Sequence, residues 1–263
     1  SVAVIEFSSA DDITVDNGSL STMTSDDNRT WEGTFTPDND TEEDNNTLSL
    51  ATTYTDLAGN NGPAETTANY EIDTIAPTVS SVAITDAEGV QNSFVNVGDN
   101  VSVTATFREA VIFDNASITP TITLAVGSDN RTAVYASGDN STALVFRYTI
   151  QAGDNDDNGT SIGANALALN SSTIRDPAGN DATLTHSLVD NNSSYKVDTI
   201  LPTVSSVAIT SADGIQNSLL NAGDNVSVTA TFSETVNVDN SSGNPTITLV
   251  VGTDNRTATY TSG

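Results

Sequence analysis

An internal repeat is the feature that most constrains the fold of this chain. Residues 73–138 align without a gap on residues 198–263. The segment DTIAPTVSSVAIT at 73–85 returns as DTILPTVSSVAIT, and the segment GDNVSVTATF returns without a change at 223–232. A repeat of this length is a structural unit copied along the chain, so we expect an array of similar units rather than one large core.

The repeat divides the chain into three predicted domains. One complete copy extends over residues 73–197, and a second copy, 198–263, covers about half of the unit. Residues 1–72 are a shorter relative, in which the DLAGN loop at 56–60 matches the DPAGN loop at 176–180. We expect the first domain to lack its opening strand, the last to be the N-terminal half of a repeat, and the sequence to be a segment of a longer array.

Short alternating segments within the complete copy predict strands and no helix. Apolar and polar residues alternate over segments rich in Val, Ile and Thr, and turn residues such as Asn158-Gly159 separate these segments. The expected strands are 78–85, 100–107, 117–126, 131–136, 142–150, 162–174 and 183–197, the last with a break at 190–192. Strands with this spacing are typical of an immunoglobulin-like β-sandwich. The predicted fold class is therefore all-β, with tandem immunoglobulin-like β-sandwich domains in an extended array and incomplete terminal domains.

Each copy of the repeat opens with an acidic residue and a proline. Asp73 precedes Pro77 by four residues, and Asp198 precedes Pro202 by the same spacing. Proline fixes its own φ and favours extended geometry in the residue before it, so each tract reads as a short, stiff linker that leads into the first strand. The sequence therefore places the domain junctions at Asp73 and Asp198.

The charge of the chain narrows the choice of partners. The sequence contains 35 Asp and Glu residues against 7 Lys and Arg residues, which gives a net charge of −28 at pH 7. Such a surface repels nucleic acid and anionic membranes and attracts divalent cations. There is no cysteine, so metal ions rather than disulfides are the expected cross-links. No apolar run reaches the roughly 18 residues of a membrane span, and we expect no direct membrane insertion.

Four motifs mark the ends and loops of the predicted domains. They are the D-T-x-x-P-T openings, the F-x-E tripeptides at 107–109 and 232–234, the AGDNDDNG loop at 152–159 and the D-x-A-G-N loops. In these motifs the chain resembles the bacterial immunoglobulin-like repeats of giant calcium-dependent surface adhesins. The resemblance implies a large, repetitive protein of the cell surface. It also implies calcium ions at the linkers and neighbouring repeats of the same long chain as partners.

Strand parity predicts which acidic loops meet at each junction. In an antiparallel sandwich, every second loop lies at the same pole, so three sources of carboxylates converge on each linker. For the first junction the expected ligands are Asp73, Glu109, Asp176 and Asn180, with Asp38, Asp40 or nearby acids of the loop at 37–46. For the second they are Asp198 and Glu234 with the loop at 154–157. Crowded carboxylates are costly without a cation, and calcium takes six to eight oxygen ligands. The alternative is that these acids are solvated turn residues.

The acidic loop at 154–159 has two interpretations. It fits the start of a calcium-binding loop, with Asp154, Asp156 and Asn158 as ligands. The Glu expected at the twelfth position is replaced by Asn165, and no helices are expected on either side, which argues against an EF-hand. The remaining choice lies between a calcium loop of another kind and a turn rich in Asp and Asn.

The first domain carries its own D-x-A-G-N loop. Asp56 and Asn60 are candidate metal ligands there, and Gly59 is expected at positive φ within the turn. Ser9 occupies the place that Glu109 has in the complete copy. Because of this departure from the pattern, the sequence does not decide whether that end of the first domain has a metal site.

No motif in the sequence predicts catalysis. There is no nucleophile elbow and no phosphate-binding loop, and His186, the single histidine, has neither a triad nor a metal-ligand context. We predict a non-enzymatic extender segment of a large extracellular adhesin, a rod stiffened by calcium at its domain junctions. Two alternatives stay open. One is a packing unit of a surface layer or filament, with lateral contacts between copies, and the other is a module that binds glycans or a surface partner.

Overall fold

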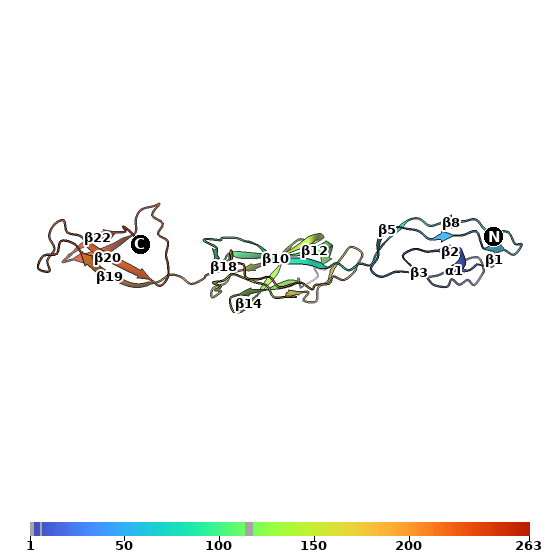
Figure 1. Cartoon of the computed structure of the whole chain (residues 1–263), viewed down its shortest axis with the longest axis horizontal. Coiled ribbons are helices and arrows are strands. Elements are labelled where there is room, and N and C mark those ends of the chain that lie inside the picture. Colours follow the sequence, from blue (N-terminus) through green and yellow to red (C-terminus); the bar gives the residue numbers. More distant parts are fainter. Residues whose placement is uncertain (1–2, 6, 114–117) are drawn as a thin grey trace. The chain divides into compact units, whose positions relative to one another are not determined.

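The computed structural model describes residues 3–5, 7–113 and 118–263, and nearly all of its regular structure is β (Figure 1). The chain divides into two compact units, residues 1–199 and residues 200–263. Within the described residues the helical structure is α1 (Ser9–Asp12), a single turn that the sequence pattern did not predict. No helix in this part of the chain has the length and apolar character needed to cross a bilayer.

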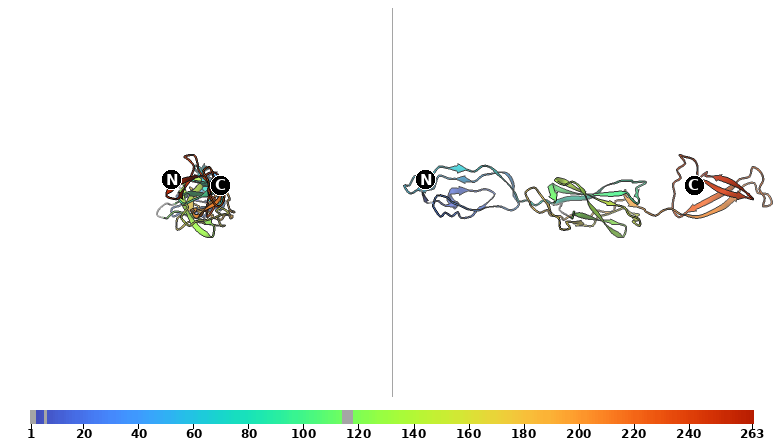
Figure 2. Two further views of the ribbon diagram at one scale, coloured as in Figure 1. Left: turned by 90° about the vertical axis from the view of Figure 1, so that its left-hand side faces the viewer. Right: turned by 180° about the vertical axis from the view of Figure 1, so that it is seen from behind.

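The complete copy of the repeat forms a continuous antiparallel ladder (Figures 1 and 2). Its strands are adjacent in the order β10, β12, β15, β14, β13 and β16. Their bounds are β10 (Val79–Ala87), β12 (Asn100–Phe113), β13 (Thr121–Val126), β14 (Asp129–Ser137), β15 (Ser141–Thr149) and β16 (Leu167–Ala168). Three short strands complete the domain. β17 (Ile174–Arg175) pairs with the end of β12, and β11 (Phe94–Val95) runs parallel to β18 (Lys196–Val197).

The core of this domain is centred on β12 and β15. Val101, Val103 and Ala105 of β12 are completely buried, as are Leu144 and Phe146 of β15. The two sets are spaced by two residues along their strands, as expected for one face of a pleated sheet. Full burial of an aliphatic or aromatic side chain stabilises the fold by about 1.5–3 kcal/mol, so these positions dominate the stability of the domain.

Two β-bulges explain how β10 presents its apolar side chains to the core. Val79, Val82, Ile84 and Ala87 do not keep a strict two-residue period in the sequence. The register with β12 shifts after Val79 and again after Ile84. Each extra residue returns the apolar side chains to the inner face, where all four pack with the core.

The last two predicted strands are wrong in extent. The segment 162–174 contains only β16 and the first residue of β17, and the segment 183–197 contains only β18. Asn165, Asn170 and Ser171 adopt positive φ, which a continuous strand does not allow. These left-handed residues interrupt the chain on both sides of β16, so most of this region is irregular.

The ends of two other strands also differ from the prediction. The strand expected over 100–107 continues to Phe113, where its last residues pair with β17. The strand expected over 117–126 begins at Thr121. Residue 117 itself lies outside the described residues.

The first domain is built from short strands. They are β1 (Val4–Ile5), β2 (Ile13–Thr14), β3 (Gly18–Leu20), β4 (Phe35–Pro37), β5 (Glu42–Asn46), β6 (Ser49–Leu50), β7 (Thr55–Asp56), β8 (Glu65–Thr66) and β9 (Tyr70–Asp73). β1 pairs with β7, β3 with β4 and β5 with β9, while β6 lies between β2 and β8. Aromatic pairs add to its packing, with ring centroids 4.8 Å apart for Phe7 and Trp31 and 5.7 Å apart for Phe35 and Tyr70.

Residues 200–263 form two antiparallel strand pairs (orange to red in Figure 2). They are β19 (Val204–Ala212) with β20 (Val226–Phe232), and β21 (Thr246–Val251) with β22 (Asp254–Thr259). The register between β19 and β20 shifts after Val204 and after Ile209, which are the counterparts of Val79 and Ile84. The two copies of the repeat thus share their bulges as well as their sequence.

Candidate metal centre

Asp73 is the last residue of the final strand of the first domain. β9 pairs with β5, and Asp73 lies opposite Glu42 in this pairing. The hydroxyl group of the next residue, Thr74, donates a hydrogen bond to the carbonyl oxygen of Asp38. The N–H of Thr74 donates to the carbonyl oxygen of Thr41, and both bonds measure 2.8 Å. The first domain therefore fixes the backbone on both sides of this carboxylate, at the point where the chain passes into the complete copy.

Glu109 and Asp176 come from the complete copy of the repeat. Glu109 lies in β12, two residues beyond the point where the pairing with β10 ends at Phe107. Asp176 follows β17 and is only 3% exposed. Its Oδ1 accepts the N–H groups of Gly179 at 2.7 Å and Asn180 at 2.8 Å. Gly179 has the positive φ that such a turn was expected to need.

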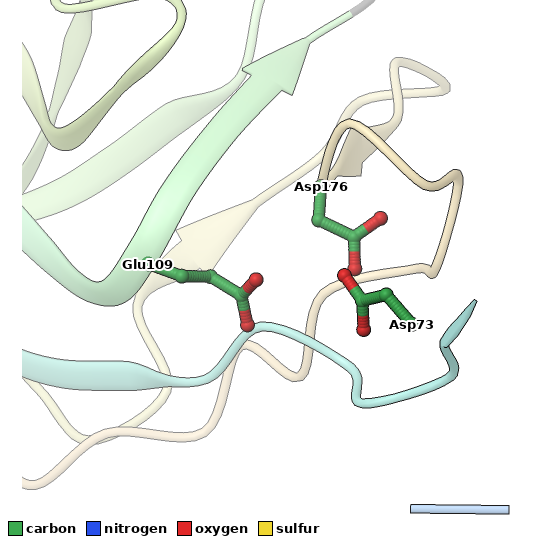
Figure 3. Close-up of side chains that lie close together, drawn as sticks. All are labelled: Asp73, Glu109 and Asp176. Atoms are coloured by element: carbon green, nitrogen blue, oxygen red, sulfur yellow. The ribbon is translucent and has the colours of Figure 1, made fainter. Parts of the chain in front are cut away.

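The three carboxylates meet in one cluster (Figure 3). One oxygen from each of Asp73, Glu109 and Asp176 lies within 4.8 Å of the other two. The Nδ2 of Asn180 donates to Oδ2 of Asp176 at 2.8 Å and to the carbonyl oxygen of Asp73 at 3.1 Å, which joins the two domains. Burial, followed by the charges of Asp73, Asp176 and Glu42, raises the pKa of Glu109 above its ordinary value.

Among the acids of the segment 37–46, Glu42 acts on this cluster, and it begins strand β5 rather than lying in the expected loop. The sequence named Asp38 and Asp40 ahead of it and included Glu42 only among the nearby acids. Asp38 contributes its backbone carbonyl to the bond from Thr74, and both of these side chains are exposed. The position of Glu42 follows from the pairing of β5 with β9, which places Glu42 opposite Asp73. The sequence pattern did not predict this pairing.

The geometry of the cluster fits a hard divalent cation. Calcium binds oxygens at about 2.3–2.6 Å, so two ligands of one ion lie at most about 5 Å apart. The spacing of 4.8 Å among the three carboxylates satisfies this limit. Asn180 now directs its amide nitrogen at two of the aspartates, and rotation of the amide by half a turn would present its oxygen instead. Asp73, Glu109, Asp176 and Asn180 can therefore supply carboxylate and amide oxygens to one ion.

Asp154 has its hydrogen bonds satisfied by the protein itself. Its Oδ2 accepts the phenol O–H of Tyr148 at 2.6 Å and the N–H of Gln151 at 2.8 Å, and its Oδ1 pairs with Nε of Arg131 at 2.6 Å. Burial and then the bond to Asp154 raise the pKa of Tyr148 to about 12. Burial acts to raise the pKa of Asp154 too, but the bonds from Tyr148, Gln151 and Arg131 outweigh it and lower that pKa. Protein donors therefore compensate the burial of this carboxylate.

Asp156 is also held by protein donors. Its Oδ2 accepts the N–H of Gly127 at 2.8 Å, and its Oδ1 accepts the N–H groups of Asn158 at 3.2 Å and Gly159 at 2.9 Å. Its backbone exchanges hydrogen bonds with Val197. These contacts tie the loop at 154–159 to the end of the domain. Calcium binding by Asp154, Asp156 and Asn158 stays a prediction.

The D-x-A-G-N loop of the first domain repeats the turn at Asp176. Asp56 accepts the N–H groups of Ala58 and Asn60 at 2.8 and 2.9 Å, and Gly59 has the expected positive φ. The Asn60 amide donates to the same carboxylate at 3.0 Å, and this bond is the largest cause of a lowered pKa at Asp56. Within the described residues, no three carboxylates gather around Asp56 as they do around Asp176. The turn is shared between the two domains, whereas the cluster is not.

Asp198 and Glu234, the remaining predicted ligands, belong to different units of the structure. Asp198 is half-buried at the end of unit 1, where its N–H donates to the carbonyl oxygen of Val95 at 3.1 Å. Glu234 lies in unit 2, directly after β20, and its Oε1 is buried without a hydrogen-bond partner. A metal site formed by these two residues stays a prediction.

Comparison with known proteins supports the fold and the repeat family. Residues 1–72 match the family model of a bacterial Ig-like domain. No curated protein and no solved structure shows a significant match to the chain. The first domain is thus similar to the bacterial immunoglobulin-like domains. Together with the strand architecture of the chain, this match confirms the predicted all-β, immunoglobulin-like fold.

Proposed function

We propose that this chain is a non-enzymatic extender segment of a large cell-surface adhesin, in which calcium fixes the junction between residues 1–72 and 73–197. The observation that carries the proposal is the cluster of Asp73, Glu109 and Asp176, in which a carboxylate from the last strand of one domain meets two from the next. Similarity of the first domain to bacterial Ig-like domains supports a structural module of the cell surface.

The physical role of the ion follows from the charges at the junction. Without a cation, three carboxylates and the nearby Glu42 repel one another, and burial together with this repulsion raises the pKa of Glu109. A calcium ion would replace the repulsion by bonds to both domains. Such bonds restrict the bending that a proline-containing linker leaves open, so the junction becomes stiff only when calcium is bound. A chain of such junctions would form a rod that projects from the cell.

Calcium titration of the full chain by calorimetry tests the site. We expect a binding event that Glu109→Gln weakens at least about tenfold, equal to about 1.4 kcal/mol. Asp86→Asn is the matched control, because this substitution also removes one negative charge. Asp86 is exposed and lies near the end of β10 that is far from the cluster. Loss of binding in Glu109→Gln with unchanged binding in Asp86→Asn supports the site. Equal calcium binding by the original chain and Glu109→Gln would show that the cluster is no calcium site.

Small-angle scattering tests the mechanical part of the proposal. The full chain is measured in chelator and in millimolar calcium, together with the two variants. We expect calcium to narrow the distribution of particle dimensions for the original chain and for Asp86→Asn, but not for Glu109→Gln. Identical scattering with and without calcium, in a chain shown to bind the ion, would contradict a stiffening role while leaving the binding site intact.

A further inference from the structure

The chain leaves the complete copy of the repeat through residues 196–199, called the exit segment below. One side of this segment is bonded to β11, which runs parallel to β18. The N–H of Lys196 donates to the carbonyl oxygen of Ser93 at 2.9 Å. The N–H of Asp198 donates to the carbonyl oxygen of Val95 at 3.1 Å. The backbone of β11 therefore accepts every second N–H of the exit segment.

The other side of the exit segment is bonded to the loop that follows β15. Val197 and Asp156 exchange two backbone hydrogen bonds, at 2.7 and 2.9 Å. The N–H of Thr199 donates to Oδ1 of Asn155 at 3.1 Å, and its Oγ1 accepts the N–H of Gly153 at 3.0 Å. Four consecutive N–H groups thus donate alternately to β11 and to this loop.

The loop segment 153–156, called the anchor loop below, is itself fixed to the interior of the domain. Asp154 and Asp156 are only 1% and 4% exposed. Arg131 of β14 and Tyr148 of β15 each bond to the carboxylate of Asp154 at 2.6 Å. A force that reaches the anchor loop is therefore passed to two central strands of the sheet.

The chain enters this domain at the opposite end from the exit segment. Val79 begins β10, and Ala87 at its other end pairs with Val101. The neighbouring Asn100 pairs with Thr149, from which the chain continues into the anchor loop. β10 has nine residues and is therefore about 30 Å long. Tension in the chain would thus act along the strands, from one end of the domain to the other.

The direction of this tension decides how the bonds of the exit segment are loaded. Hydrogen bonds between strands lie across the strand direction. A pull along the exit segment therefore loads its bonds to β11 and to the anchor loop together, whereas a pull across the strands would open them one after another. Bonds that share a load have to break in one step. This raises the barrier to unfolding under force, and that barrier sets how long a stretched domain survives.

We propose that β11 and the anchor loop form a clamp that holds the exit segment against tension, so that residues 73–197 act as a load-bearing element. This role goes beyond stiffening by calcium, because the clamp resists extension of the chain and the calcium ligands restrict bending at the other end of the domain. The buried carboxylates of Asp154 and Asp156 hold the anchor loop in place, and the exit segment transfers the load to it.

Constant-force measurements with optical tweezers on the full chain test the clamp. The sequence contains no cysteine, so Ile75→Cys and Leu201→Cys define the two points of attachment on either side of the domain. Both side chains are exposed, at 36% and 81%, and accept a linker without a change in the core. The measurements are made in chelator, so that calcium at the cluster of Asp73, Glu109 and Asp176 does not contribute.

Two double variants form a matched pair. The clamp variant, Asn155→Ala with Thr199→Val, removes the two side-chain bonds between Thr199 and the anchor loop. The control variant, Asn100→Ala with Thr149→Val, removes two side-chain bonds of similar kind outside the clamp. These are the bonds from Thr149 to Asn100 at 2.7 Å and from Asn100 to Glu88 at 2.8 Å.

Under the same force, we expect the clamp variant to unfold at least about tenfold faster than the control variant. In urea without force, the unfolding rates of the two variants should agree within about threefold, since unfolding then does not have to begin at the exit segment. Equal unfolding rates of the two variants under force would overturn the proposal. A tenfold difference that is equally large in urea would overturn it too, because it would show a general loss of stability. Neither result bears on calcium binding at the other end of the domain.

Discussion

At the scale of single residues, the structure shows two different surroundings for the predicted acidic ligands. The string DNDDNG at 154–159 reads as a calcium loop, but which way an aspartate points depends on partners far along the chain. Arg131 and Tyr148 donate hydrogen bonds to the buried side chain of Asp154, and no local sequence motif predicts these contacts. Asp73, Glu109 and Asp176, in contrast, were predicted to meet from strand parity alone, and they do meet. Parity predicts which loops are neighbours and does not predict which side chains are satisfied by protein donors.

The Arg131–Asp154 pair gives a prediction with an internal control. Arg131→Ala leaves a buried carboxylate with one charged partner fewer, which should lower the free energy of unfolding of its domain by about 2–3 kcal/mol. Arg256→Ala, at the same position of the other copy, removes only an exposed pair with Asp254 and should cost less than about 0.5 kcal/mol. Amide exchange of β12 and of β20, measured on the full chain, reports the two effects separately. Equal losses would contradict a structural role for Asp154.

Glu109 gives a prediction of pH dependence, measured in chelator. A carboxyl group whose pKa is raised on folding binds its proton more tightly in the folded state. The stability that this proton contributes is lost as pH rises from the ordinary value of 4.5 through the raised value in the folded protein. Glu109→Gln removes this decline, so the variant should be more stable than the original chain at pH 7, by up to about 1 kcal/mol.

Thermal unfolding of the Glu109→Gln variant from pH 4.5 to pH 8 measures the effect. In millimolar calcium the sign should reverse, because the variant then lacks a ligand while the original chain is stabilised by binding. Asp86→Asn should follow the original chain under both conditions. A variant that is less stable than the original chain in chelator at pH 7 would contradict a cost of burying ionised Glu109 beside these carboxylates.

At the scale of strands, alternation predicted the first five strands of the complete copy but not the last two. Val, Ile and Thr at alternate positions in β12 or β15 leave few choices, since one face must be buried. The segment 162–174 contains Asn165 and Asn170, which tolerate a left-handed backbone, and sequence alone does not show that they adopt it. His186 then replaces part of the expected ladder by accepting the N–H of Ala166 on its Nε2, at 2.8 Å. A side chain used in this way is invisible to a pattern of apolar residues.

The hairpin between β13 and β14 offers a test of how loops are fixed by their surroundings. Gly127 and Ser128 form its two-residue turn, and Gly127 has a φ of +60°. A Cβ at Gly127 would lie 2.3 Å from the carbonyl oxygen of Asn155, whereas one at Gly252, its counterpart with a φ of +65°, meets nothing within 4 Å. Gly252→Ala should cost about 1–2 kcal/mol for its backbone alone, and Gly127→Ala about 1–3 kcal/mol more. Urea titration followed by amide exchange in each hairpin measures both values, and equal costs would refute the contact with Asn155.

At the scale of the whole chain, the repeat predicted similar strands in both copies, and the structure has them with the same bulges. The strands of the two copies differ in their exposure to solvent, because exposure depends on the strands that pair with them. The sequence GDNVSVTATF occurs at 98–107, where β12 is buried between two neighbours, and at 223–232, where β20 has one. Phe107 is 2% exposed and Phe232 is 39% exposed.

These identical segments make amide exchange a direct measure of tertiary structure. The intrinsic exchange rate of an amide depends on its own residue and the one before it, and these are the same in both copies from Asp99 and Asp224 onward. Any difference in rate must therefore come from packing and opening of the surrounding structure. We expect the amides of β12 to exchange at least about a hundredfold more slowly than those of β20, equal to about 2.7 kcal/mol. NMR on the full chain resolves the two copies, and equal rates would show that residues 200–263 are as stable as the complete copy although β20 pairs with β19 alone.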